Sequence, residues 1–355
     1  MKLVAKFQAA PQKCDFYIQP GILSSCGRII QSLKPSQIFV VTNPRVRRLY
    51  FEDLRQSLCQ AGCQRITIIS IPEGEVHKDL KYLMICYHKL ILHDADRLSL
   101  IITLGGGVIS DLGGMAAATY MRGIKLAHIP TTLVAQVDAS IGGKTAVNHE
   151  RSKNIFGSFY QADCVILDPL VLATLSRREY LSGLVEIIKI SLISNPRLFK
   201  YLCKNIFRLK RRNSISLQNI IQEALELKLN IVTQDPNEIG LRKVLNFGHT
   251  FGHALETTTR YSRYSHGEAV ALGILVSLKL GKNYGILAQV QKLFNQIDLP
   301  TKIRRVSPKT LWKFMRLDKK SGFGRVNFVL LRGIGKPYFK GVTFQEFKSA
   351  LDAIF

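Results

Sequence analysis

The first half of the chain repeats short, continuous runs of β-branched and aliphatic residues, separated by stretches with helical patterning. Runs of this kind, bounded by turn residues, are typical of strands buried on both faces of a sheet. Their alternation with helical stretches such as 46–61 and 78–92 predicts a doubly wound, mostly parallel α/β sheet. The runs are QIFVVTN (37–43), RITIISI (65–71), LSLIITL (98–104), IKLAHIP (124–130) and CVILD (164–168).

After about residue 169 the pattern changes to apolar positions with a period near 3.6, which is typical of helices. We therefore expect two domains, an α/β domain at residues 1–174 and a helical domain at residues 175–355. A crevice between two such halves is a common place for a ligand. The clearest helical segments are 179–192, 217–233, 251–258 and 267–284.

Composition indicates a protein of the cytoplasm. Hydrophobic residues make up 46% of the 355 positions, enough for a sizeable core. No apolar run reaches the roughly 18 residues that a membrane-spanning helix needs, and the start, MKLVAKFQAAPQK, lacks the apolar region of a signal peptide. The seven cysteines form no CxxC pair. Free thiols in a reducing compartment are the expected state.

The formal net charge of +25 admits either a nucleic-acid partner or an anionic substrate. The densest basic cluster, RLKRR at 208–212, has no interleaved aromatic residues. Nucleic-acid binding as the main function is therefore disfavoured. We interpret the positive charge either as a general property of a basic proteome or as part of a site for an anionic substrate.

A glycine-rich turn, LGGGVISDLGG, follows the run at 98–104 and leads into a helical stretch. Three glycines let backbone amides approach a diphosphate at a helix start, where the helix dipole also favours anions. The spacing is not GxGxxG, so the usual dinucleotide fingerprint is absent, and a tight structural turn would look similar. Asp111 is either a contact to a sugar or amide of the cofactor, or a favourable charge in the first helical turn.

The stretch DASIGGKTAVN ends like a phosphate-binding P-loop but has Asp138 where that pattern needs a glycine. A P-loop follows a strand and opens a helix. The residues alone leave two readings open: a damaged triphosphate loop, or a turn whose Lys144 serves a different anion, next to paired glycines that allow close backbone approach.

Three of the eight histidines fall within eighteen residues. His249 and His253 in LNFGHTFGHALE are four apart and share a helical face, and His266 follows in YSHGEAV. A catalytic zinc site has three protein ligands and one open position. The motif lacks the glutamate of HExxH, which argues against a metalloprotease. Spacing alone leaves open which of the three are ligands.

Two further patterns fit this site. Glu186, in LVEIIKI, is either half of a solvated ion pair or, given its apolar neighbours, a ligand or a buried paired carboxylate. Basic residues also recur beside asparagines, at 153–154 and 242–246, and beside an aspartate, at 318–320. Together with a metal and a nucleotide turn, they suggest a small, highly anionic substrate.

The chain resembles the 3-dehydroquinate synthases of the sugar-phosphate cyclase superfamily. The resemblance runs from about residue 40 to 330, in order, through PEGEVHK, LGGGVISDLGG, IPTTLVAQVDASIGGKTAVN, KNIFGSFYQ, GLVEIIK, LNFGHTFGHALE, SHGEAVALG and DKK. It implies an N-terminal NAD-binding α/β domain and a C-terminal helical domain. It also implies a carbon–oxygen lyase that converts 3-deoxy-D-arabino-heptulosonate 7-phosphate to 3-dehydroquinate and phosphate. The implied route is transient oxidation by NAD, phosphate elimination, reduction, ring opening and aldol closure, assisted by zinc, or cobalt in its place.

The resemblance also implies roles for individual residues. The metal ligands are Glu186, His249 and His266, and His253 handles protons or substrate. The family is dimeric, and Arg122 reaches the phosphate in the neighbouring subunit. The substrate residues are Lys144, Asn154, Lys189, Lys228, Arg242, Asn246 and, in preference to Lys319, Lys320. The cofactor residues are Asn43, Glu73, Gly74, Glu75, Val76, His77, Lys78, Gly106, Gly107, Val108, Ile109, Ser110, Asp111, Thr131, Thr132, Asp138, Lys144, Lys153, Thr174, Leu175 and Glu179.

Three alternatives remain open. One is a cyclase of the same superfamily that acts on another sugar phosphate. Lys228, Arg242 and Asn246 argue against it, because they suit a substrate with a carboxylate. The second is a metal-dependent polyol dehydrogenase, which would release NADH. The third is a nucleic-acid-binding protein without catalysis, against which the metal and lysine set argues.

Overall fold

The computed structural model describes residues 13–150, 152–260, 262–304, 306–318 and 324–351. They form two compact units. The first contains Ile22–Pro130, Gly143–Leu167 and the described residues before Ile18, and the second contains Ile18–Gly21, Thr131–Gly142 and the chain from Asp168 onward. Two short segments of the second unit thus lie between parts of the first unit in the sequence. The division into domains at residue 174 stays a prediction.

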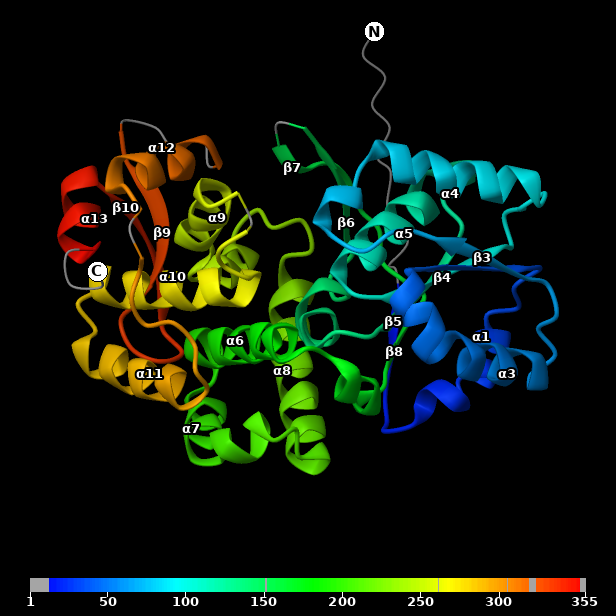
Figure 1. Cartoon of the computed structure of the whole chain (residues 1–355), viewed down its shortest axis with the longest axis horizontal. Helices are drawn as coiled ribbons and strands as arrows, with labels where there is room; N and C mark the ends of the chain where they lie inside the picture. Colours follow the sequence, from blue (N-terminus) through cyan, green and yellow to red (C-terminus); the bar gives the residue numbers. More distant parts are fainter. Residues whose placement is uncertain (1–12, 151, 261, 305, 319–323, 352–355) are drawn as a thin grey trace, which may run out of the picture. The chain divides into compact units, whose positions relative to one another are not determined.

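A six-stranded sheet, in the order β1-β8-β5-β4-β2-β3, forms the centre of the first unit (Figure 1). The five apolar runs all form strands of this sheet, and they pair in parallel. Strands β2, β4 and β8 are buried along their whole length, as continuous apolar runs predict. The expected α/β sheet is confirmed. The strands are β1 (Asp15–Ile18), β2 (Ile38–Thr42), β3 (Ile66–Ser70), β4 (Leu100–Gly105), β5 (Lys125–Pro130) and β8 (Cys164–Leu167).

The strand order reverses direction between β2 and β4. From β2 the chain moves to β3 on one side, and β4 then lies on the other side of β2. Helices α1 (Gly27–Ser32) and α3 (Glu52–Gln60) cover one face of the sheet, and α4 (Leu80–Leu92) and α5 (Gly107–Thr119) the other (Figure 1). Open α/β sheets bind ligands at the carboxyl ends of the strands at such a switch point. The glycine turn after β4 and Asn43 after β2 both lie there.

Lys144 opens a strand rather than a helix. The antiparallel hairpin of β6 (Lys144–His149) and β7 (Ser152–Phe159) follows the short helical segment η5 (Ala135–Ala139). Gly142 and Gly143 between them have φ angles of 94° and 67°, a left-handed conformation that favours glycine. A P-loop has the opposite order, strand then helix, so the P-loop reading of this stretch is excluded.

The second unit is mainly helical, as expected, around a central helix, α10 (Figure 1). This helix is buried on nearly all sides, because its sequence HGEAVALGILVSLKL is apolar around its circumference. The two-stranded β9–β10 sheet was not anticipated. The elements are α6 (Arg177–Ser194), α7 (Pro196–Lys210), α8 (Ser214–Gln234), α9 (His249–Thr258), α10 (His266–Leu280), α11 (Tyr284–Gln296), α12 (Pro308–Asp318), β9 (Val326–Leu331), β10 (Pro337–Val342) and α13 (Phe344–Leu351).

Candidate active site

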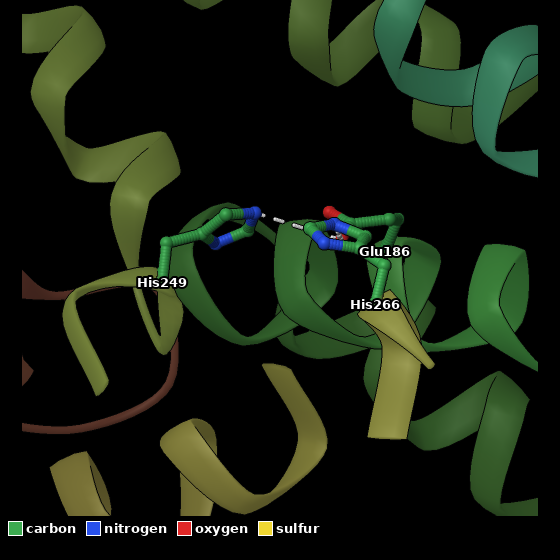
Figure 2. Close-up of side chains that lie close together, drawn as sticks. All are labelled: Glu186, His249 and His266. Atoms are coloured by element: carbon green, nitrogen blue, oxygen red, sulfur yellow. Dashed lines mark hydrogen bonds and ion pairs between the residues drawn. The ribbon is translucent and has the colours of Figure 1, made fainter. Parts of the chain in front are cut away.

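Three helices of the second unit bring Glu186, His249 and His266 together (Figure 2). Oε1 of Glu186 lies 3.2 Å from Nε2 of His266 and 3.7 Å from Nε2 of His249. One candidate ligand atom from each residue lies within 4.8 Å of the other two. The residues come from α6, α9 and α10, so a cluster spread over eighty positions of sequence is assembled by helix packing.

Local sequence signals fix where these helices begin and how closely they approach. Ser265 caps α10 in a capping box with Glu268, so the helix begins at His266. The residue after it, Gly267, packs against α6: a Cβ there would lie 2.3 Å from the Cα of Ser182. Gly248, with φ 79°, turns the chain into α9 directly before His249. Small residues and caps thus place the two histidines beside Glu186.

The donor set fits a divalent transition metal. Two imidazole nitrogens and one carboxylate oxygen, with a fourth position open, form a common catalytic zinc set. Zinc bonds of about 2.0–2.1 Å in a tetrahedron place ligand atoms roughly 3.4 Å apart, close to the 3.2 and 3.7 Å measured here. The Glu186 side chain is 1% exposed, whereas that of His266 is 34% exposed, so one side of the cluster faces solvent.

Electrostatics favour the ligand-competent forms of Glu186 and His249, whereas His266 must lose a proton before it can bind a metal. Burial raises the pKa of Glu186, but Lys189, His249 and His266 outweigh it and hold that pKa well below its usual value. Burial, followed by the charge of Lys189, lowers the pKa of His249 well below its usual value, so this imidazole is neutral. A metal ligand must be neutral imidazole or carboxylate. Burial lowers the pKa of His266, but contacts to Glu186 and Glu256 raise it to about 10.

Buried cations lie in the same unit. Lys189 contacts Oε2 of Glu186, and Lys228 contacts Oδ1 of Asp138 and hydrogen-bonds to its carbonyl at 2.5 Å. Burial raises the pKa of Asp138, but Lys228 and Lys189 bring it down to about 2. Burial lowers the pKa of Lys228, with Asp138 opposing the shift. Predicted substrate cations and a predicted cofactor residue thus form one charge network.

Arg242, Asn246 and His253 also lie in this unit. The Arg242 guanidinium, which is buried, donates to the carbonyls of Pro236 and Gly142 at 2.6 and 2.9 Å. Asn246 donates to Glu238 at 2.8 Å. The ring centroid of His253 lies 5.3 Å from that of His249 and 6.4 Å from that of His266. Arg242 and Asn246 are therefore held by hydrogen bonds, and His253 lies beside the two candidate histidine ligands.

A second polar cluster lies in the first unit, around Lys78. This buried lysine contacts Asp111 and donates to Asn154 at 2.7 Å. Glu75 accepts from Asn148 at 2.9 Å and lies 4.0 Å from Lys153. The structure thus brings together residues from the PEGEVHK motif, the glycine turn and the β6–β7 hairpin.

Other predicted residues follow strand ends or helix starts. Gly106 forms the N-terminal cap of α5, so the amides of the following residues face the sheet's carboxyl edge. Thr131 follows β5, and its buried hydroxyl has no hydrogen-bond partner among the described residues. Thr132 accepts from Ala135 at 3.2 Å. A buried hydroxyl without a partner is rare in native proteins and fits a contact to a bound group.

The remaining predicted residues have local structural contacts or are exposed. Asn43 caps α2 (Pro44–Val46) by accepting from Val46 at 2.9 Å. Glu179 lies in the first turn of α6, whose cap is Ser176, and the carbonyl of Leu175 accepts from Arg212 at 2.6 Å. Lys144 and Arg122 are exposed. Lys319 and Lys320 lie outside the described residues.

Sequence reasoning missed Glu256, Glu238 and Asn148, each of which contacts a predicted residue. Glu256 had a signal, because it lies seven positions after His249 and therefore on the same helical face. Asn148 and Glu238 had no such signal, because their partners, Glu75 and Asn246, do not lie on the same helix or strand as they do.

Comparisons with known proteins show which family this chain belongs to. The family model for the 3-dehydroquinate synthase N-terminal region matches residues 68–182, and that for the C-terminal region matches residues 183–321. The chain is 41% identical over 338 residues to 3-dehydroquinate synthase of Pelobacter propionicus, covering 94% of each. It is 43% identical over 319 residues to the Geotalea uraniireducens enzyme, covering 88% of each.

A solved structure shows the same fold. The 2-epi-5-epi-valiolone synthase of Streptomyces hygroscopicus, with NAD⁺ and Zn²⁺ bound, superposes with a TM-score of 0.89 at 27% identity, covering 99% of each chain. In the described part of this chain, no helix is long and apolar enough to cross a membrane. With family models spanning most of its length and full-length relatives above 40% identity, the chain belongs to the 3-dehydroquinate synthase family.

Proposed function

We propose that this chain is a 3-dehydroquinate synthase that converts 3-deoxy-D-arabino-heptulosonate 7-phosphate to 3-dehydroquinate and phosphate. The observation that carries the proposal is the metal-ligand cluster of Glu186, His249 and His266 in the same unit as the buried cations Lys189, Lys228 and Arg242. A substrate with a carboxylate, several hydroxyls and a phosphate needs this combination of Lewis acid and fixed positive charge.

A divalent metal, zinc or cobalt, held by the three ligands would supply a Lewis acid at the reacting hydroxyl, and NAD would supply a hydride acceptor. The chain's own residues bind and orient. Lys189 and Lys228 are held in place by carboxylates, which fixes their positions before an anion arrives. Arg242 is held by two carbonyls, and His253 stands beside two ligands, where it can take or give a proton.

We propose a cofactor site at the carboxyl ends of the parallel strands, where the sheet has its switch point. The amides at the start of α5 would face the diphosphate, and Lys78, held by Asp111, would add a fixed positive charge nearby. Lys144 and Asn154, from the β6–β7 hairpin, and Lys320 complete the proposed substrate set. This assignment follows the family resemblance, motif by motif.

We further propose a cytoplasmic homodimer in which Arg122 reaches the phosphate of the neighbouring subunit's substrate. Two observations support parts of this. All seven cysteines are free thiols, as expected in a reducing compartment. Arg122 is exposed, so its guanidinium is available to a neighbouring subunit.

The deciding experiment incubates the metal-loaded protein with heptulosonate phosphate and NAD, and follows phosphate, 3-dehydroquinate and NADH together. We expect equal amounts of phosphate and dehydroquinate without net NADH. Glu186→Gln should abolish both products, while Gly285→Ala on a remote helix serves as the matched control. Net NADH without phosphate would contradict the proposal and indicate a dehydrogenase.

A second candidate is a cyclase with a different sugar-phosphate substrate, favoured by the likeness to 2-epi-5-epi-valiolone synthase. The same assay separates the two. Phosphate release from a heptulose phosphate that lacks the carboxylate, with none from heptulosonate phosphate, would favour this second candidate.

A further inference from the structure

His266 lies between two carboxylates. Its Nε2 is 3.2 Å from Oε1 of Glu186, and its Nδ1 is 3.5 Å from Oε2 of Glu256. The Glu256 side chain is 8% exposed. Glu256 belongs to α9, seven residues after His249, so a single helix face carries one candidate metal ligand and a carboxylate that contacts another.

The orientation of the two histidines follows a common pattern. Nδ1 of His249 lies 3.2 Å from the carbonyl oxygen of Phe247, while its Nε2 faces Glu186. Nδ1 of His266 likewise faces an oxygen, that of Glu256. A neutral imidazole has one N–H, and an acceptor at Nδ1 selects the tautomer that leaves the Nε2 lone pair available. Both rings are therefore arranged to present Nε2 to the same point.

We propose that Glu256 is a positioning residue that holds the His266 ring in its Nδ1–H tautomer and directs Nε2 at the metal. The proposal rests on the metal site of the proposed function. Hydrogen bonds from the outer nitrogen of a histidine ligand to a carboxylate raise its basicity and fix its ring, and their loss weakens metal binding.

The start of helix α10, where His266 lies, is held by contacts that do not involve Glu256. The position of the helix can therefore be tested separately from the orientation of the His266 ring. Ser265 and Glu268 form the capping box at this helix start, and Arg178 donates to Glu268 at 2.8 Å. Gly267 packs against Ser182. Removing Glu256 would therefore take away a contact of the ring while the start of α10 keeps these anchors.

The test titrates metal-free, full-length protein with Co²⁺ and records both the dissociation constant and the visible absorption spectrum of the bound ion. We expect Glu256→Ala to weaken Co²⁺ binding about 10- to 100-fold and to alter the spectrum. Glu256→Gln should recover part of the loss, because its amide oxygen can still accept from Nδ1–H. Glu268→Gln, the matched control at the same helix start, should lower the melting temperature but leave the spectrum unchanged.

Wild-type affinity and spectrum in Glu256→Ala would overturn the proposal, as would equal weakening in Glu268→Gln. If Glu256→Ala does not fold, ¹⁵N-histidine spectra of the zinc-loaded wild type decide: a proton on Nδ1 of His266 supports the proposal, and a proton on Nε2 overturns it. Failure of the metal site itself is distinguishable, since the wild-type protein would then bind no Co²⁺ at all.

Discussion

Replacing Gly267 with alanine is expected to separate His266 from Glu186 and so destroy the metal site from a position that touches no metal. A Cβ at this position would lie 2.3 Å from the Cα of Ser182. Carbon atoms in contact normally lie about 3.5–4.0 Å apart. Helices α6 and α10 would have to separate locally by about 1.2–1.7 Å, whereas metal sites tolerate deviations of about 0.2 Å in ligand distance.

The assay compares thermal unfolding with and without zinc. At free zinc a thousand times the wild-type dissociation constant, binding adds about 4.1 kcal/mol to the free energy of unfolding. If Gly267→Ala weakens binding 100-fold, the same relation leaves about 1.4 kcal/mol. Overpacking should also lower the stability of the metal-free protein by about 1–3 kcal/mol.

Gly285→Ala is the matched control. This glycine also lies in a helix, α11, but no atom lies within 4 Å of the position its Cβ would take. Alanine should therefore raise helix stability by up to about 1 kcal/mol and leave the zinc effect unchanged. A full zinc-dependent rise in Gly267→Ala would refute the claim that close helix contact sets the ligand spacing.

Further predictions concern the buried polar groups. Lys228→Met should destabilise the protein by about 3 kcal/mol, because it leaves the Asp138 carboxylate in a largely buried site without its cation. Urea unfolding of Lys228→Met, of Asp138→Asn and of the variant with both changes measures this. The pKa of Asp138 is about 2 when folded, below its unfolded value of about 3.9. Its stabilising effect, about 2 kcal/mol, should therefore be complete above pH 4 and disappear as the pH falls toward 2. Unfolding of wild type and Asp138→Asn at several pH values should show their difference shrinking over this window, and a constant difference would contradict the pairing. Thr131→Val should leave the stability of the ligand-free protein unchanged, since the hydroxyl has no partner among the described residues. The same change should weaken NAD binding about tenfold. Calorimetric titration with NAD measures this, and an unchanged affinity would remove Thr131 from the cofactor site. His266→Ala should abolish metal retention through dialysis, measured by elemental analysis, and full retention would exclude it as a ligand.

The sheet could be predicted because its strands are buried on both faces and so appear as continuous apolar runs. The hairpin at 144–159 could not, because polar residues and glycine interrupt its pattern, and both its strands carry exposed positions. The β9–β10 sheet was hidden for a different reason. Val326–Leu331 is an apolar run like the others, but it lies within a half of the chain where helical periodicity dominates.

The site could be predicted only in part. His249 and His253 share a helix and His266 follows closely, so this cluster was visible in the sequence, with Glu186 as a further candidate; the motif resemblance then selected Glu186, His249 and His266 as the ligands. Contacts between distant segments were not visible. Lys228 and Asp138 are ninety positions apart, and their pairing follows from helix α8 packing beside η5. Periodicity describes the face of one helix, whereas the partner depends on packing between elements.

From the charges around the metal-ligand cluster we expect an anion to bind more tightly once the metal is in place. In the ligand-free chain, Glu186 is ionised, Lys189 is charged, and the raised pKa of His266 keeps a proton on its ring. A divalent ion in place of that proton raises the local charge by one. At 4 Å and an effective dielectric constant of about 20, one added charge is worth about 4 kcal/mol of attraction for an anion. Because such coupling is reciprocal, a bound anion would in turn hold the metal more tightly. We therefore expect Lys189 to serve two states of the same site, balancing Glu186 before the metal binds and attracting the anion afterwards.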